Sequence, residues 1–135
     1  MDDCELRISH VATLECARPL RHALSAFMIA LEVDSVLCED VLTAVGEALA
    51  NALEHAYKGH ELGNVELYAK DDDRKNLFVA VRDHGNFIVR DENPGRGFGL
   101  PIVRAIAQSI LVDRTAGTHV QMTFDIFSPA QAISR

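Results

Sequence analysis

Hydrophobic and polar residues follow two different periods along this chain, and each period predicts one kind of element. Apolar residues at every second position predict a strand over Leu6–Leu14. Helical spacing follows directly and predicts a helix over residues 17–33. A second helix is predicted to begin at Asp34 or Ser35, since either side chain can cap it, and to run to about Tyr57.

The second half of the chain contains mainly predicted strands. Residues 64–72 and 77–83 alternate, and the charged segment between them predicts a hairpin turn. Residues 84–99 concentrate glycine and proline, which predicts a long loop. The remaining predicted elements are a helix over 100–109, strands over 110–115 and 118–127 around a two-residue turn at Ala116-Gly117, and a loose tail from Ser128. This order predicts an α/β fold, a two-layer sandwich in which helices cover one face of a mixed, mostly antiparallel sheet.

Length, charge and cysteine content narrow the class of protein. With 135 residues and 48% hydrophobic residues, the chain predicts a single folded domain over residues 1–135. A formal net charge of −7 argues against nucleic acid or an anionic membrane as a general partner, although backbone amides and a metal ion can still hold a nucleotide's phosphates. The sequence shows no CxxC pair, no signal peptide and no run of about 18 apolar residues. A soluble cytoplasmic domain is therefore expected.

The predicted second helix carries a polar stripe in the segment GEALANALEHAY. Glu47, Asn51 and His55 are spaced by four residues, so they lie on one side of the helix with Glu54 beside them. An asparagine oxygen suits Mg²⁺, which takes few protein ligands and keeps other positions for phosphate and water. A glutamate one turn away can act as the base for a hydroxyl or water that attacks a phosphoryl group. The same spacing also fits solvated polar residues on an exposed helix face.

Two strand ends carry further candidates for nucleotide binding. Asp83 ends an apolar strand with Gly85 just beyond it, and a carboxylate there can accept a hydrogen bond from an exocyclic amine such as that of adenine. Thr118 begins the final strand and can add a hydroxyl to a base-binding network. Each residue also fits an ordinary role, a turn aspartate in one case and a strand threonine in the other.

The segment PGRGFGL places three alternating glycines, Gly95, Gly97 and Gly99, at the entry to a predicted helix. Glycines allow the backbone to approach phosphates closely, and a helix N-terminus favours their charge. Arg96 can clamp a phosphate oxygen. The segment lacks the βαβ context of a Rossmann fingerprint and the GKS or GKT of a Walker loop, and a flexible turn explains it as well as a phosphate site does.

In combination these motifs resemble a known family. An ExxxN helix, a strand that ends in DxG, a GxGxG loop that opens a helix, and a GT pair before the last strand occur in this order in the histidine-kinase-like (GHKL) ATPases. Their Bergerat-type ATP-binding fold is shared by gyrase-type ATPases, a heat-shock chaperone family and histidine kinases. The resemblance covers about residues 34–127 and is closest to the bacterial anti-sigma-factor serine/threonine kinases, whose EAxxNAxxHxY helix is matched by EALANALEHAY. A sensor histidine kinase is disfavoured, because no helical hairpin with a phosphoacceptor histidine precedes the domain.

The resemblance implies a role for each matching residue. Glu47 would be the catalytic base, Asn51 the Mg²⁺ ligand and Asp83 the acceptor for the adenine amine. The other ATP-binding positions would be His55, Gly85, Thr118 and the lid residues Gly95, Arg96, Gly97, Phe98, Gly99 and Leu100. Phe87 departs from the family pattern, because a second glycine is usual there, and the lid is short. Both departures leave the base and the metal ligand in place.

The same resemblance implies partners and a cycle. The kinase would sequester a sigma factor or another regulator, and it would bind and phosphorylate a small STAS-type anti-anti-sigma protein, with ATP and Mg²⁺ as cofactors. Phosphorylation would release that protein and free the kinase, commonly a homodimer, to hold its regulator again. Two alternatives stay open: a non-catalytic binding module tuned by nucleotide, which the altered glycine box favours, and a simple ATPase with water as acceptor.

Overall fold

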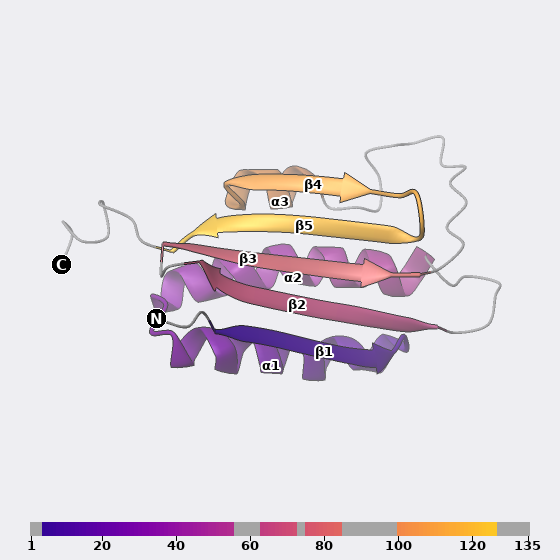
Figure 1. Cartoon of the computed structure of the whole chain (residues 1–135), viewed down its shortest axis with the longest axis horizontal. Coiled ribbons are helices and arrows are strands. Elements are labelled where there is room, and N and C mark those ends of the chain that lie inside the picture. The colour runs from indigo at the N-terminus through magenta and orange to yellow at the C-terminus, as the bar shows by residue number, and fades with distance from the viewer. Residues whose placement is uncertain (1–3, 56–62, 73–74, 85–99, 127–135) are drawn as a thin grey trace.

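The computed structural model describes residues 4–55, 63–72, 75–84 and 100–126, and in this part of the chain five strands form one sheet with the helices on one face (Figure 1). The elements in chain order are β1 (Glu5–Val11), the 3₁₀ helix η1 (Leu14–Cys16), α1 (Ala17–Ala30), α2 (Ser35–His55), β2 (Asn64–Asp72), β3 (Asn76–Asp83), α3 (Leu100–Ile106), β4 (Ser109–Asp113) and β5 (Thr118–Asp125). The strand order is β1-β2-β3-β5-β4, and each neighbouring pair is antiparallel. The predicted two-layer α/β sandwich is confirmed, and its described sheet is antiparallel throughout rather than mixed.

α1 ends earlier than predicted because of the residue that follows its last turn. Glu32 adopts a φ of 63°, the left-handed conformation that commonly terminates a helix. The backbone amides of Glu32 and Val33 donate hydrogen bonds back to carbonyls of the last turn, at 2.9 and 3.0 Å. The helix therefore stops at Ala30 instead of continuing to residue 33.

The start of α2 is fixed by a side-chain cap. Oδ2 of Asp34 accepts hydrogen bonds from the backbone N–H groups of Val36 at 3.1 Å and Leu37 at 3.4 Å. These amides belong to the first turn and have no carbonyl partner within the helix. Of the two predicted caps, Asp34 is therefore the one used, and Ser35 is the first helical residue.

Other predicted boundaries shift by a few residues. β1 ends at Val11, because Leu14–Cys16 forms η1 instead of continuing the strand. α3 ends at Ile106 and β4 already begins at Ser109, which the sequence pattern assigned to the helix. The predicted end of the second helix at Tyr57 lies outside the described residues.

The core lies between the sheet and the helices. In β2, Val65, Leu67 and Ala69 are buried while the residues between them are more exposed, as the period-two pattern predicts. The buried residues of α1 and α2 are Leu20, Leu24, Met28, Cys38, Val41, Ala44, Val45, Ala48, Leu49, Asn51 and Ala52. Full burial of a large aliphatic side chain stabilises a fold by about 1.5–3 kcal/mol, so this layer holds α2 firmly against the sheet. None of the described helices is long and apolar enough to cross a membrane.

Candidate functional site

α2 places Asn51 at a buried position with an unsatisfied oxygen. The residue is only 4% exposed, and its neighbours Ala48 and Ala52 belong to the core. Its Oδ1 atom is buried and has no hydrogen-bond partner among the described residues. A buried acceptor without a partner costs about 1–3 kcal/mol, so a folded protein seldom keeps one without a use for it. Oδ1 of Asn51 is therefore a candidate ligand atom.

The other members of the predicted polar stripe differ in accessibility. Glu47, one turn before Asn51, is partly exposed, so its carboxylate remains within reach of a bound molecule. Glu54 is exposed and takes part in a polar interaction. His55 is the last residue of α2, and its side chain lies outside the described part of the structure. The alternative of a solvated helix face thus fits Glu54 and is wrong for Asn51.

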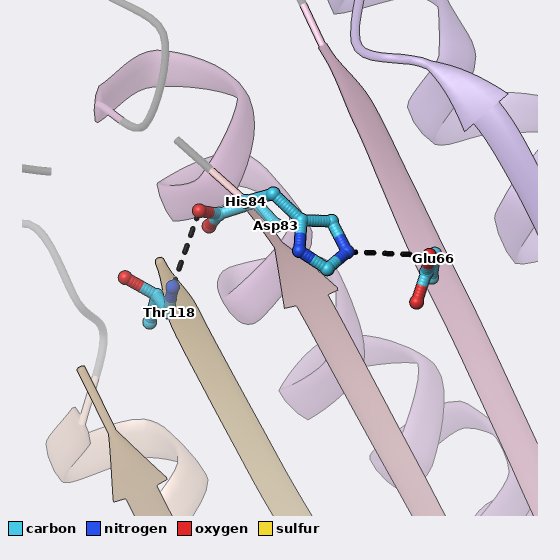
Figure 2. Close-up of polar contacts among 4 residues, drawn as sticks. All are labelled: Glu66, Asp83, His84 and Thr118. Carbon is cyan, nitrogen blue, oxygen red and sulfur yellow. Dashed lines mark hydrogen bonds and ion pairs between the residues drawn. The ribbon is translucent and has the colours of Figure 1, made fainter. Parts of the chain in front are cut away.

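The ends of β3 and β5 meet in a buried polar pair, which Figure 2 shows. Asp83, the last residue of β3, is 1% exposed, and Thr118, the first residue of β5, is 4% exposed. The two residues are register partners, and the backbone N–H of Thr118 donates to Oδ1 of Asp83 at 3.2 Å. Two candidates predicted from distant segments are thereby adjacent. A carboxylate held by a backbone donor is an oriented acceptor for a ligand's N–H group.

Gly117 explains why this pair comes so close. Its φ is +79°, which non-glycine residues rarely adopt. A Cβ atom at this position would overlap the carbonyl oxygen of Asp83 and lie 2.8 Å from Cα of His84. The sequence predicted a hairpin turn at this glycine but gave no sign of its contact with β3, because that contact depends on the strand order.

A group of ionisable side chains lies near the Asp83–Thr118 pair, on the face of the sheet that the helices do not cover. Nε2 of His84 lies 3.3 Å from Oε2 of Glu66, which links the end of β3 to β2 (Figure 2). Burial, and in second place the Arg82 guanidinium, lowers the pKa of His119 below its usual value. These ionisable residues were not among the candidates predicted from the sequence, whose one signal was the alternation that assigns Glu66, Arg82 and His119 to the outer face of the sheet.

The glycine-rich candidates fall in the segment between β3 and α3. Gly85, Gly95, Arg96, Gly97, Phe98 and Gly99 lie outside the described residues, so their roles stay predictions. Leu100 is the first residue of α3, as the sequence predicted, and its side chain also lies outside the description. α3 packs against α2 and buries Val103, so the helix that follows the glycines contacts the helix that carries Asn51.

The described candidates lie toward one end of the sandwich. Figure 1 shows the arrowhead of β3, the start of β5 and the C-terminal end of α2 at the same side of the molecule. An open cavity of about 250 Å³ lies toward the other end of the sheet and contains none of the candidates; it is lined by Leu31, Glu32, Val33, Asp71 and Ile126. The end of the sheet that contains Asp83 is therefore identified as the candidate site by its side-chain chemistry and not by the size of a cavity.

A divalent metal fits this site only together with a phosphorylated ligand. In the parts of the chain that the structure describes, no three His, Cys, Asp or Glu side chains gather into a metal site. Mg²⁺ bound to a nucleotide needs only one or two protein ligands, because phosphate oxygens and waters complete its octahedron. The unpartnered Oδ1 of Asn51 is a hard oxygen ligand of this kind.

An antiparallel α/β sandwich with a buried asparagine on its long helix and an aspartate–threonine pair at its strand ends has the architecture of an ATP-binding domain of the Bergerat type. Residues 10–124 match the histidine kinase-like ATPase domain, and the chain belongs to this family. The family inferred from the sequence motifs is therefore confirmed.

Two curated relatives are similar to the chain. One is a serine-protein kinase RsbW of Bacillus licheniformis, 30% identical over 102 residues, which span 63% of this chain and 62% of the relative. The other is an anti-sigma F factor of Clostridium beijerinckii, 25% identical over 134 residues, with 90% of this chain and 93% of the relative covered. The chain thus spans less than two thirds of the first relative and nearly all of the second.

Solved structures show the same fold. The RsbU and RsbW domains of Rv1364c from Mycobacterium tuberculosis align with a TM-score of 0.74 at 24% identity, over 93% of this chain and 33% of that one. The histidine kinase domain of a blue-light activated histidine kinase from Erythrobacter litoralis aligns with a TM-score of 0.59 at 22% identity, over 82% of this chain and 60% of that one. The predicted Bergerat-type fold is confirmed.

Proposed function

We propose that the protein is an ATP-dependent serine/threonine kinase and anti-sigma factor of a partner-switching system. The observation that carries this proposal is the buried Oδ1 of Asn51, unpartnered among the described residues, one helical turn after the accessible Glu47. Membership of the ATPase family supports the nucleotide, and similarity to a serine-protein kinase and an anti-sigma F factor supports a protein acceptor.

ATP binding would use both layers of the sandwich. Asp83, held by Thr118, would accept a hydrogen bond from the exocyclic amine of adenine. The segment 95–100 would close over the phosphates with its glycine backbone and Arg96, while His55 and Gly85 complete the surroundings. Asn51 would hold Mg²⁺ through Oδ1, and the ion would supply charge that offsets the charge on the phosphates.

Phosphoryl transfer would then depend on Glu47. Its carboxylate accepts the proton of a serine or threonine hydroxyl on the partner as that oxygen bonds to the γ-phosphorus. The bond from that phosphorus to the bridging oxygen breaks, and ADP leaves with the electron pair. A base in this position typically contributes about 10²–10⁴-fold to the rate.

The biological setting is proposed from the family resemblance. The acceptor would be a STAS-type anti-anti-sigma protein in the cytoplasm, and the sequestered partner a sigma factor or another regulator. A homodimer of the kinase would exchange the sequestered regulator for the anti-anti-sigma protein. The net charge of −7 supports regulation through protein partners rather than through direct nucleic-acid contact.

A second candidate function is a binding module that uses nucleotide for shape alone. Phe87 favours it, because a glycine is usual at this position of the family's nucleotide-binding box. Binding of the regulator would then be unaffected when Glu47 is replaced, and replacement of Asn51 would change it only through the loss of bound nucleotide.

The test measures transfer directly. The protein is incubated with Mg·ATP and the STAS-type protein encoded nearest to it, and that partner is weighed by intact mass spectrometry, with Glu47→Gln and Glu39→Gln in parallel. Glu39 is exposed two turns earlier on α2, so its replacement controls for removing one charge from the helix. The kinase hypothesis predicts one added phosphate with the parent protein and the control, and none with Glu47→Gln. A complex without phosphate supports the binding module, and phosphate release without any partner supports an ATPase.

A further inference from the structure

The turn between β4 and β5 is held by a side chain that the proposed function leaves unused. Asp113 ends β4, and its Oδ1 accepts hydrogen bonds from the backbone N–H of Thr115 at 3.0 Å and from the Oγ1 hydroxyl of the same residue at 2.9 Å. The backbone bond first, and the hydroxyl bond second, lower the pKa of the Asp113 carboxyl. The carboxylate is therefore ionised at neutral pH and fixes the first half of the turn.

Gly117 brings the second half of this turn against β3. Its left-handed φ of +79° and the missing Cβ let the turn lie directly on the peptide that joins Asp83 to His84. A Cβ atom at this position would overlap the carbonyl oxygen of Asp83, so the turn can lie this close to β3 only with glycine there. The conformation of the turn and the position of the β3 end are thus mechanically linked.

Thr118 completes the link one residue later. Its backbone N–H donates to Oδ1 of Asp83 at 3.2 Å, as Figure 2 shows, and both residues are buried. A hydrogen bond weakens steeply when its angle is poor, so displacement of this amide would remove one of the contacts that orient the carboxylate. A continuous path therefore runs from the exposed carboxylate of Asp113, through the turn, to the buried carboxylate of Asp83.

We propose that Asp113 is a positioning residue for base recognition: through the turn that it holds, it sets the orientation of Asp83 and so the preference for adenine over a base that lacks the exocyclic amine. The inference rests on the proposed function, in which Asp83 accepts a hydrogen bond from that amine. Asp113 itself touches no substrate. A base that carries a carbonyl in place of the amine would direct its carbonyl oxygen at the Asp83 carboxylate, so that two acceptors face each other. The site disfavours such a base only if the Asp83 carboxylate is held in a fixed orientation.

The experiment compares Mg·ADP with Mg·IDP, whose base carries a carbonyl in place of the amine, by titration calorimetry. Five proteins are titrated: the parent, Asp113→Ala, Asp113→Asn, Thr115→Val and Asp72→Ala. Asp113→Asn keeps an oxygen acceptor for Thr115, whereas Thr115→Val removes the hydroxyl bond and keeps the backbone one. Asp72 is an exposed aspartate at the opposite end of the sheet, so its replacement controls for the lost negative charge.

The ratio of the two dissociation constants is the decisive readout. We expect the parent to prefer ADP by about tenfold or more, the size of one hydrogen bond to a charged acceptor. Asp113→Ala should reduce this ratio by roughly threefold or more, as expected for a bond that is misaligned rather than lost, with a smaller reduction in Thr115→Val. Asp113→Asn and Asp72→Ala should keep the parent ratio, because the turn acceptor is present in both.

The possible failures are distinguishable. A parent protein that binds neither nucleotide removes the proposed function and this inference with it. A parent that prefers ADP while Asp113→Ala keeps the same ratio overturns the role of Asp113 alone. Equal weakening of both nucleotides in Asp113→Ala also overturns it, because a merely structural role would lower both affinities together.

Discussion

Gly117 lies against the main chain of Asp83 so closely that a side chain of any size would overlap the aspartate's carbonyl oxygen. Replacement by alanine therefore combines a steric clash with a left-handed φ of +79°. We expect Gly117→Ala to lower the free energy of unfolding by about 1–3 kcal/mol, the usual strain at such a position, and to abolish detectable nucleotide binding. Urea denaturation and calorimetry check the two effects.

Gly46 provides the matched control for this substitution. It lies inside α2, and a Cβ there would meet only the Cδ and Nε atoms of the Arg21 side chain at 4.0 Å, an ordinary contact. Gly46→Ala should raise the unfolding free energy by about 0.5–1 kcal/mol, because glycine is a poor helix former. Equal effects of the two substitutions would contradict the close approach of the β4–β5 turn to β3.

Asn51 is expected to lower the stability of the ligand-free protein and to be needed for nucleotide binding. Replacing it with leucine, which has the same branching at Cγ and no polar side-chain atoms, removes a buried oxygen that has no partner among the described residues. Asn51→Leu should raise the unfolding free energy of the ligand-free protein by about 1–3 kcal/mol. It should also remove the stabilisation by Mg·ADP, which is about 2.7 kcal/mol at 100 times the dissociation constant.

Thermal melting with and without Mg·ADP measures both effects of Asn51→Leu. A variant that melts lower than the parent without ligand would show that the amide already has partners in the free protein. A variant that keeps the full ligand shift would show that Asn51 holds neither the metal ion nor the nucleotide.

His119 should make stability depend on pH. Burial first, and the Arg82 guanidinium second, lower its pKa in the folded protein below the ordinary value of 6.5. The unfolded chain then binds more protons below this pH, so the stabilising effect of the neutral ring is complete above 6.5 and is lost as the pH falls toward the lowered folded value.

Urea denaturation at several pH values between 7.5 and 5, roughly the range in which a histidine changes charge, measures this effect. His119→Gln should flatten the profile, since glutamine carries no titrating group. His22→Gln, at an exposed position on α1, is the reference for replacing a histidine. Parallel profiles for the parent and His119→Gln would assign the pH dependence to other groups.

Asp34 should stabilise α2 through its cap. Its Oδ2 accepts the amides of Val36 and Leu37, so Asp34→Ala should lower the unfolding free energy by about 1 kcal/mol, the usual value of such a cap. Asp34→Asn should retain most of it, and Ser35→Ala should have little effect because the cap lies one residue earlier. The opposite ranking in urea denaturation would mean that Ser35 caps the helix.

The sequence predicted those features that depend on neighbouring residues. Helical periodicity located α2 and grouped Glu47 with Asn51, and period-two alternation identified β2 and β3. Where two local signals competed, the sequence pattern was ambiguous, as for the two possible caps of α2. The pattern also extended α1 too far, because the left-handed position that ends the helix is occupied by Glu32 and not by the glycine or asparagine that usually marks a helix end.

The sequence did not predict the contacts that depend on strand order. Asp83 and Thr118 are 35 positions apart, and their hydrogen bond exists only because β5 inserts beside β3. The contact of Gly117 with β3 has the same origin. The local sequence around Gly117 indicated only a hairpin turn, so the positioning role of Asp113 required the structure.

The strand order also has a consequence for the newly made chain. β5 pairs with both β3 and β4 although it follows them in the sequence, and β4 pairs only with β5 in the described sheet. A ribosome adding about 5–20 residues per second needs about 2–7 s to travel from Asp83 to Thr118, and during that time β3 lacks the partner strand on one of its edges. The buried Asp83–Thr118 pair therefore forms only after synthesis has reached β5, and a nascent chain lacks this end of the candidate site before then.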